Sequence, residues 1–192
     1  MKKLFAVVAL ALMTLTISAQ DGSNLTLKAG VGVSSVVGSD ADTKMTLAYK
    51  AGISYDLGIS ENFSIIPGAE FVTKGFKADN VEGNIGMSYI QVPIFAAFKL
   101  PVTDVMKVAI KVGPYASYGV FGSDIEWANG KTTNVFDSDG GFERFDAGAI
   151  AGLSFEFEQF MLGLEYSRGL LKLDKDFKMY NQAFGIVLGY NL

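Results

Sequence analysis

The C-terminal stretch YNQAFGIVLGYNL, Tyr180–Leu192, alternates between two kinds of side chain. Large and mostly apolar residues take every second position: Tyr180, Gln182, Phe184, Ile186, Leu188, Tyr190 and Leu192. The positions between them hold small or polar residues: Asn181, Ala183, Gly185, Val187, Gly189 and Asn191. A period of two over this length is typical of a strand and not of a helix. One face of large apolar side chains and one face of small side chains predict the closing strand of a transmembrane barrel.

The same alternation recurs along the rest of the chain. It predicts strands over residues 25–35, 46–57, 63–74, 89–99, 107–119, 145–157, 162–167 and 180–192. The connections alternate in length: 58–62, 101–104 and 158–159 are short, whereas 38–44, 75–86, 122–143 and 170–178 are long. Short periplasmic turns and longer outside loops are typical of outer-membrane barrels. The expected fold class is all-β, an eight-stranded antiparallel up-and-down transmembrane β-barrel, closed by pairing of the first strand with the last.

The more polar face of these strands decides between two kinds of barrel. In a soluble barrel of lipocalin type, large apolar side chains fill the interior and polar ones face water. Here the polar face is rich in glycine and alanine, which suits a narrow interior better than a solvated surface. The charged residues on this face are equal in number of each sign: Lys28, Lys50, Glu70, Lys74, Lys111, Asp146, Glu156 and Glu165. We expect them to form a buried interior charge network; a solvated charged face is the alternative.

The composition excludes several functions. The chain of 192 residues fits one domain, and it contains neither cysteine nor histidine. It therefore lacks a thiol nucleophile, a disulfide framework, and the commonest general base and zinc ligand. A net charge of −4 without basic clusters argues against a nucleic-acid partner.

The N-terminus has the pattern of a targeting segment. Lys2 and Lys3 precede the apolar run Leu4–Leu12, and Ile17-Ser18-Ala19 offers a cleavage site. We expect residues 1–19 to be a cleaved signal peptide and residues 20–192 to be the outer-membrane barrel domain. An uncleaved anchor helix is the alternative, although the apolar run is short of the roughly 20 residues of a span.

Three prolines fall inside predicted strands: Pro67, Pro93 and Pro114. A closed barrel has no free edge on which to place a residue without a backbone N–H. We therefore expect bulges or breaks in the hydrogen-bond ladder at these positions.

Several segments resemble the PorT family of outer-membrane β-barrel proteins, which is common in the Bacteroidetes. They are Tyr89-Ile90-Gln91-Val92-Pro93-Ile94, Gly113-Pro114-Tyr115, Phe145–Gly152, Leu164–Gly169 and Leu188-Gly189-Tyr190. The resemblance covers nearly all of the mature chain and implies an eight-stranded barrel in the cell outer membrane. It implies little about activity.

The closing strand also resembles the signal by which the barrel-assembly machinery recognises its clients. Gly185, Leu188 and Tyr190 fit that pattern, while Phe184 takes a place that is usually polar. The resemblance implies that this machinery is a partner during biogenesis.

The sequence gives little indication of a catalytic site or a metal site. The small outer-membrane barrel enzymes of this architecture, which are phospholipases, palmitoyl transferases and proteases, rely on histidine, so we expect no catalysis. Glu156 and Glu165 could form a carboxylate pair across neighbouring strands, but balancing interior lysines is the simpler role. Asp137-Ser138-Asp139-Gly140 is similar to the start of a calcium loop but lacks the distal glutamate. We expect no cofactor and no metal.

The predicted function is a structural or interaction role through the extracellular loops, in a monomer surrounded by outer-membrane lipid. The only tryptophan, Trp127, lies among acidic and amide residues of the longest loop and could contact a partner that the sequence does not identify. Two alternatives remain open at this point: a narrow solute channel, and a soluble lipocalin-like binding barrel in the periplasm. Eight strands leave an interior that side chains fill, which disfavours the channel.

Overall fold

The computed structural model describes residues 25–38, 43–78, 85–126, 132–137, 141–173 and 178–192. The signal peptide predicted at 1–19, Trp127, and residues 138–140 of the predicted calcium-loop segment lie outside these ranges. Among the described residues, no helical segment has the length and hydropathy of a membrane span. The strands are β1 (Leu25–Val37), β2 (Thr43–Lys44), β3 (Thr46–Tyr55), β4 (Leu57–Gly58), β5 (Phe63–Ala78), β6 (Ile85–Thr103), β7 (Met106–Gly122), β8 (Asp124–Glu126), β9 (Thr132–Asn134), β10 (Phe145–Phe157), β11 (Phe160–Gly169) and β12 (Tyr180–Asn191).

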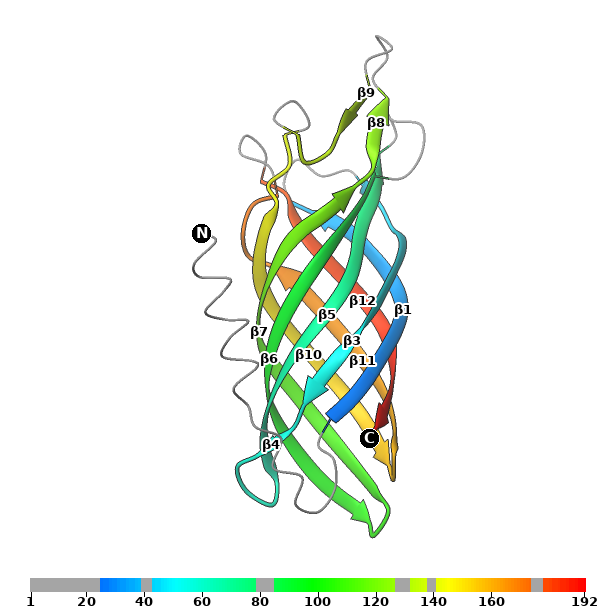
Figure 1. Ribbon diagram of the computed structural model, residues 1–192, viewed down its shortest axis with the longest axis vertical. Coiled ribbons are helices and arrows are strands. Elements are labelled where there is room, and N and C mark those ends of the chain that lie inside the picture. Colours follow the sequence, from blue (N-terminus) through cyan, green and yellow to red (C-terminus); the bar gives the residue numbers. More distant parts are fainter. Residues whose placement is uncertain (1–24, 39–42, 79–84, 127–131, 138–140, 174–177) are drawn as a thin grey trace.

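The eight long strands form a closed antiparallel barrel. Each pairs with its sequence neighbour, in the order β1, β3, β5, β6, β7, β10, β11, β12, and β12 pairs back with β1. The strands are tilted, with the short turns and the C-terminus at one end and β8 and β9 beyond the other end (Figure 1). The predicted eight-stranded up-and-down barrel is confirmed. We call its two ends the short-turn end and the loop end.

The seam between β1 and β12 depends on close backbone approach. The pairing is continuous from Thr26↔Asn191 to Val37↔Tyr180. At its centre Gly32 lies opposite Gly185, and a Cβ on Gly32 would stand 2.1 Å from the carbonyl oxygen of Phe184. Since a side chain does not fit at that distance, the small-residue face of these two strands is what allows the barrel to close.

The two faces of the wall have opposite character, as the alternation predicts. Along β12, Phe184, Ile186, Leu188 and Tyr190 are exposed on the outside, whereas Val187 is buried inside. An exposed apolar outer wall suits lipid. It contradicts the lipocalin-like alternative, in which the apolar side chains would fill the interior.

The three prolines interrupt the ladder without bulging it. Pairing of β5 with β6 stops after Pro67, and pairing of β6 with β7 stops after Pro93, where Pro114 would be the next partner. The register is the same on both sides of each gap. The register shifts lie elsewhere, beside Ser88 and Pro101.

The loop end differs most from the sequence prediction. β5 and β6 extend into the segment 75–86 that was expected to be a loop, and the segment 122–143 contains the antiparallel hairpin β8–β9. In these extensions the buried face carries the apolar residues Phe76, Ile85 and Met87, which reverses the pattern that marked the other strands. The strand signal was therefore missed there, although the backbone pairing continues.

Candidate functional site in the barrel interior

A chain of alternating charges crosses the middle of the barrel. The carboxylate of Glu70 accepts from Lys28 at 2.6 Å and lies 3.0 Å from Lys50, which contacts Glu165 at 2.5 Å. The Gln91 amide donates a further hydrogen bond to Glu70 at 3.3 Å. Glu70 is only 2% exposed. This central belt ties together strands on opposite sides of the barrel, and every charge in it has an opposite neighbour.

A second group of polar side chains lies nearer the loop end. Lys74 contacts Asp146 at 3.0 Å and lies 4.3 Å from the centre of the Tyr115 ring. The same carboxylate oxygen of Asp146 accepts hydrogen bonds from the Tyr115 hydroxyl and the Asn181 amide, both at 3.1 Å. The lysine is therefore held by a carboxylate and by an aromatic face.

A third group lies at the short-turn end. Lys99 forms ion pairs with Asp56 and with Glu156, the latter at 3.4 Å. These side chains are more exposed than Lys28, Glu70 and Glu165 of the central belt and are about as exposed as Lys50. Solvent therefore weakens the pairs relative to the buried ones.

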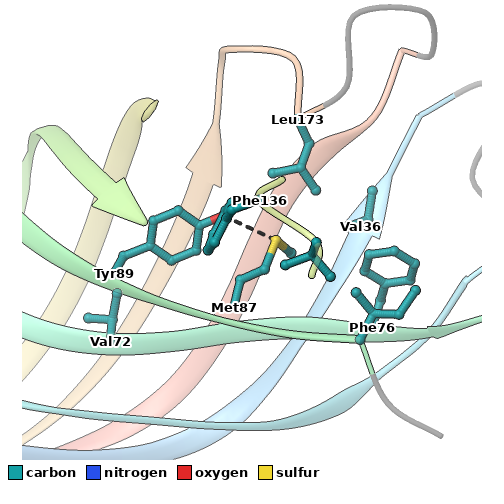
Figure 2. Packing of buried hydrophobic residues seen from close by; sticks show 9 residues of the cluster. Val36, Val72, Phe76, Met87, Tyr89, Phe136 and Leu173 are labelled. Carbon is teal, nitrogen blue, oxygen red and sulfur yellow. Dashed lines mark hydrogen bonds between the residues drawn. The ribbon is translucent and has the colours of Figure 1, made fainter. Parts of the chain in front are cut away.

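Apolar side chains close the loop end, where the polar groups stop. Tyr89 is fully buried, and its hydroxyl donates a hydrogen bond to the Met87 sulfur at 3.3 Å (Figure 2). Phe136, from the turn after β9, packs edge-on to the Tyr89 ring at 5.9 Å between centroids. The whole cluster is Val36, Val72, Phe76, Ile85, Met87, Tyr89, Val135, Phe136 and Leu173. We call it the mouth cluster.

Two glycines make room for the mouth cluster. A Cβ on Gly119 would stand 2.4 Å from the Phe136 ring, and one on Gly122 would stand 2.3 Å from the Val135 side chain. A larger residue at either position would displace the loop. The glycines of β7 therefore let the long loop fold back over the end of the barrel.

All eight residues predicted for the charge network point into the barrel, but their pairing differs in part from the expectation. We expected Glu156 and Glu165 to balance Lys28, Lys50 and Lys111. Glu165 does pair with Lys50, as expected. Glu156 pairs with Lys99, Lys28 pairs with Glu70, and Lys111 contacts the Met161 sulfur at 3.4 Å. The partners could not be read from alternation, because it gives the face of a residue and not its height in the barrel.

Sequence reasoning also missed functional neighbours of the network. Gln91 donates a hydrogen bond to Glu70, and Tyr115 and Asn181 donate hydrogen bonds to Asp146. The signal available for them in the sequence was their position on the inward face of the alternation, which they share with the charged residues. The two glutamates considered as a carboxylate pair do not face each other, because Glu165 lies opposite Gly152 and Glu156 opposite Met161.

The proposed assembly-signal residues lie on β12. Gly185 faces β1 across the seam, and Leu188 and Tyr190 are exposed on the outer wall. The Tyr190 ring packs against Phe160 at 5.4 Å between centroids. In the part of the chain that the structure describes, no cluster of acidic side chains has the arrangement of a metal site.

A closed eight-stranded barrel with an apolar outer wall and a charge-filled interior defines an outer-membrane β-barrel protein. The chain matches the family described as "Outer membrane protein beta-barrel domain" over residues 18–175, and it belongs to that family. None of the curated proteins matches the chain.

Solved outer-membrane barrels have a similar fold. The outer membrane enzyme PagL superposes with a TM-score of 0.57 at 11% identity, over 87% of this chain and 99% of that one. Neisserial surface protein A gives 0.53 at 9% identity, over 90% and 100%. The attachment invasion locus protein Ail of Yersinia pestis gives 0.47 at 12% identity, over 90% and 100%. Identities this low indicate a shared fold alone.

The likeness to PagL corrects the expectation that the chain is not an enzyme. That expectation rested on the absence of histidine, which removes one general base but leaves carboxylates, lysines and hydroxyls in the interior. An outer membrane enzyme has the same kind of barrel. The exclusion of catalysis from architecture and composition was therefore wrong.

Proposed function

We propose that this chain is a PorT-type barrel of the Bacteroidetes outer membrane that presents its loop end to a partner outside the cell. It is exported with a cleaved signal peptide and assembled through its C-terminal strand. Its short turns face the periplasm and its long loops face outward, as in other outer-membrane barrels.

The observation that carries this proposal is the closure of the loop end by its own long loop. Val135 is completely buried and Phe136 is nearly so, although both belong to a connection between strands. From this fixed base β8 and β9 extend past the end of the barrel (Figure 1). Because the base of this hairpin is anchored by buried residues, a partner that contacts it has less conformational freedom to remove than it would on a free loop.

The filled interior supports an interaction role over the alternative of a narrow channel. The central belt spans the lumen, and the mouth cluster closes one end with apolar side chains. A permeating solute would have to displace both. Solute conduction is therefore disfavoured.

The PorT assignment is supported by where the resembling segments lie. Tyr89 belongs to the mouth cluster, and Gln91 and Tyr115 donate hydrogen bonds to Glu70 and Asp146 inside the barrel. The segments thus supply the side chains that complete the interior, which gives a physical reason for this pattern of residues.

Electrical recording and cross-linking test the interaction role together. The refolded protein is expected to give no stepwise conductance in planar bilayers. Because the chain has no cysteine, the variant Asp137→Cys has a single thiol. This thiol is labelled with benzophenone-maleimide on intact cells. We expect a discrete adduct on irradiation, and none from Asp104→Cys at the short-turn end.

A different result would favour the channel. That result is stepwise conductance from the wild type that disappears in Gly163→Met. A Cβ at this inward position meets only ordinary contacts, so the variant can fold, while the methionine side chain would obstruct the lumen. Identical cross-linking from both cysteine positions would also contradict the interaction role.

A further inference from the structure

A cavity of about 490 Å³ lies at the short-turn end of the barrel. Its apolar lining includes Ile66, Phe95 and Met161, and its outer rim includes the exposed turn residues Asp104 and Glu158. The cavity therefore reaches from the interior to the side of the barrel that carries the short turns. It is large enough for a small organic molecule.

Lys111 lines this cavity and differs from the other interior lysines. It is only 5% exposed, yet among the described carboxylates none forms an ion pair with it, whereas Lys28, Lys50, Lys74 and Lys99 each have at least one. Its ammonium group contacts the Met161 sulfur at 3.4 Å and lies 6.0 Å from the centre of the Phe95 ring. A thioether is a weak acceptor, so the charge is poorly compensated.

The same aromatic ring has a second cation nearby. The Lys28 ammonium lies 5.4 Å from the centre of Phe95, but its charge is balanced by Glu70 at 2.6 Å. One net positive charge therefore remains at the inner end of the cavity, next to apolar surface. This combination suits an anion that carries an apolar group.

The outer part of the cavity limits how much charge the ligand can carry. Asp56 and Glu156 share a single lysine, Lys99, so this part of the lining has an excess of negative charge. A multiply charged anion such as phosphate would be repelled on entry, while a monoanion is compensated fully by Lys111.

We propose that this cavity is a binding site for a small monocarboxylate with an apolar body, whose carboxylate pairs with Lys111 and whose body packs on Phe95, Ile66 and Met161. In the orientation of the proposed function, the ligand enters from the periplasm. The site lies at the end opposite the loops, so its existence does not depend on the loop partner.

Benzoate is the probe that tests this site. The folded barrel, labelled with ¹³C in its methionine methyl groups, is titrated with benzoate, and the signal that Met161→Leu removes is followed. We expect a saturable shift of that signal. Benzyl alcohol, which has the same ring and no charge, and inorganic phosphate are expected to produce none.

Two lysine variants make the test specific. Lys111→Met is expected to weaken benzoate binding by at least about tenfold. Lys107→Met, which removes an exposed lysine of the same lining, is expected to change it little. Heat-modifiable gel migration verifies that each variant is folded.

Several outcomes would overturn the proposal. They are a shift with benzoate that does not saturate, an equal shift with benzyl alcohol, and unchanged benzoate binding in folded Lys111→Met. If Lys111→Met does not fold, the comparison of benzoate with benzyl alcohol on the wild type decides the matter.

Discussion

At the level of single residues, the interior of the barrel is organised by ion pairs between lysines and carboxylates. Alternation along the strands predicted which charged residues point inward. It did not predict that Glu156 of β10 would pair with Lys99 of β6, because these strands are not neighbours and their contact depends on tilt and stagger across the lumen. Eight residues of the interior network were thus predictable, whereas the participation of Asp56 and Lys99 and most of the pairing were not.

Glu70 is the residue on which the central belt depends. Glu70→Ala leaves the Lys28 ammonium buried without a partner and removes one of the two partners of Lys50. We expect a loss of about 3–5 kcal/mol in the free energy of unfolding, measured by urea titration in lipid vesicles. Glu61→Ala, in an exposed turn, is the control and should change little. An unchanged midpoint for Glu70→Ala would place Glu70 outside the barrel.

Lys74 and Lys111 should respond in opposite ways to the same substitution. Lys74→Met leaves Asp146 without its ion-pair partner and should destabilise the barrel by about 3–5 kcal/mol. Lys111→Met removes a buried charge that no described carboxylate pairs with, and should leave stability unchanged or raise it by about 1 kcal/mol. The same urea titration compares the two. Equal destabilisation would mean that Lys111 has a carboxylate partner in solution.

At the level of strands and loops, closure of the wall depends on glycine. Gly32→Val is expected to prevent pairing of β1 with β12, since even a Cβ would meet the Phe184 carbonyl at 2.1 Å. The protein should then fail to show a faster-migrating unheated band in detergent gels. Gly58→Ala is the matched control, because a Cβ there meets nothing within 4 Å. A folded Gly32→Val barrel would show that the seam is looser than its backbone spacing indicates.

The long loop was predicted as a loop, and its packing was not. The burial of Phe136 depends on Tyr89 and Gly119, which are distant in sequence, so no local pattern signals it. We expect Phe136→Ala to lower the local stability of this loop by about 3 kcal/mol and to speed its cleavage by protease about 100-fold. Phe121→Ala removes an exposed phenylalanine nearby and should leave the cleavage rate nearly unchanged. Equal rates in the two variants would mean that Phe136 does not anchor the loop.

At the level of the whole molecule, the barrel fold and the outer-membrane location follow from the same distribution of apolar and polar side chains. Apolar residues face outward, charged and small ones face inward, and the short turns gather at one end. The first and last strands were both evident from alternation, so the closure of the barrel could be predicted, whereas the extended strands and the β8–β9 hairpin at the loop end could not. Catalysis could not be excluded in this way, because a barrel of this kind also serves as an enzyme in PagL.

The orientation of the barrel, that is, which of its ends reaches the cell exterior, can be measured directly. Single cysteines at Asp137, near the loop end, and at Asp104, in a short turn, are treated on intact cells with a maleimide that does not cross membranes. We predict that Asp137→Cys is labelled on intact cells and that Asp104→Cys is labelled only after the outer membrane is permeabilised. Labelling of both positions only after permeabilisation, or of Asp104→Cys alone on intact cells, would contradict an outer-membrane barrel that presents its long loops outward.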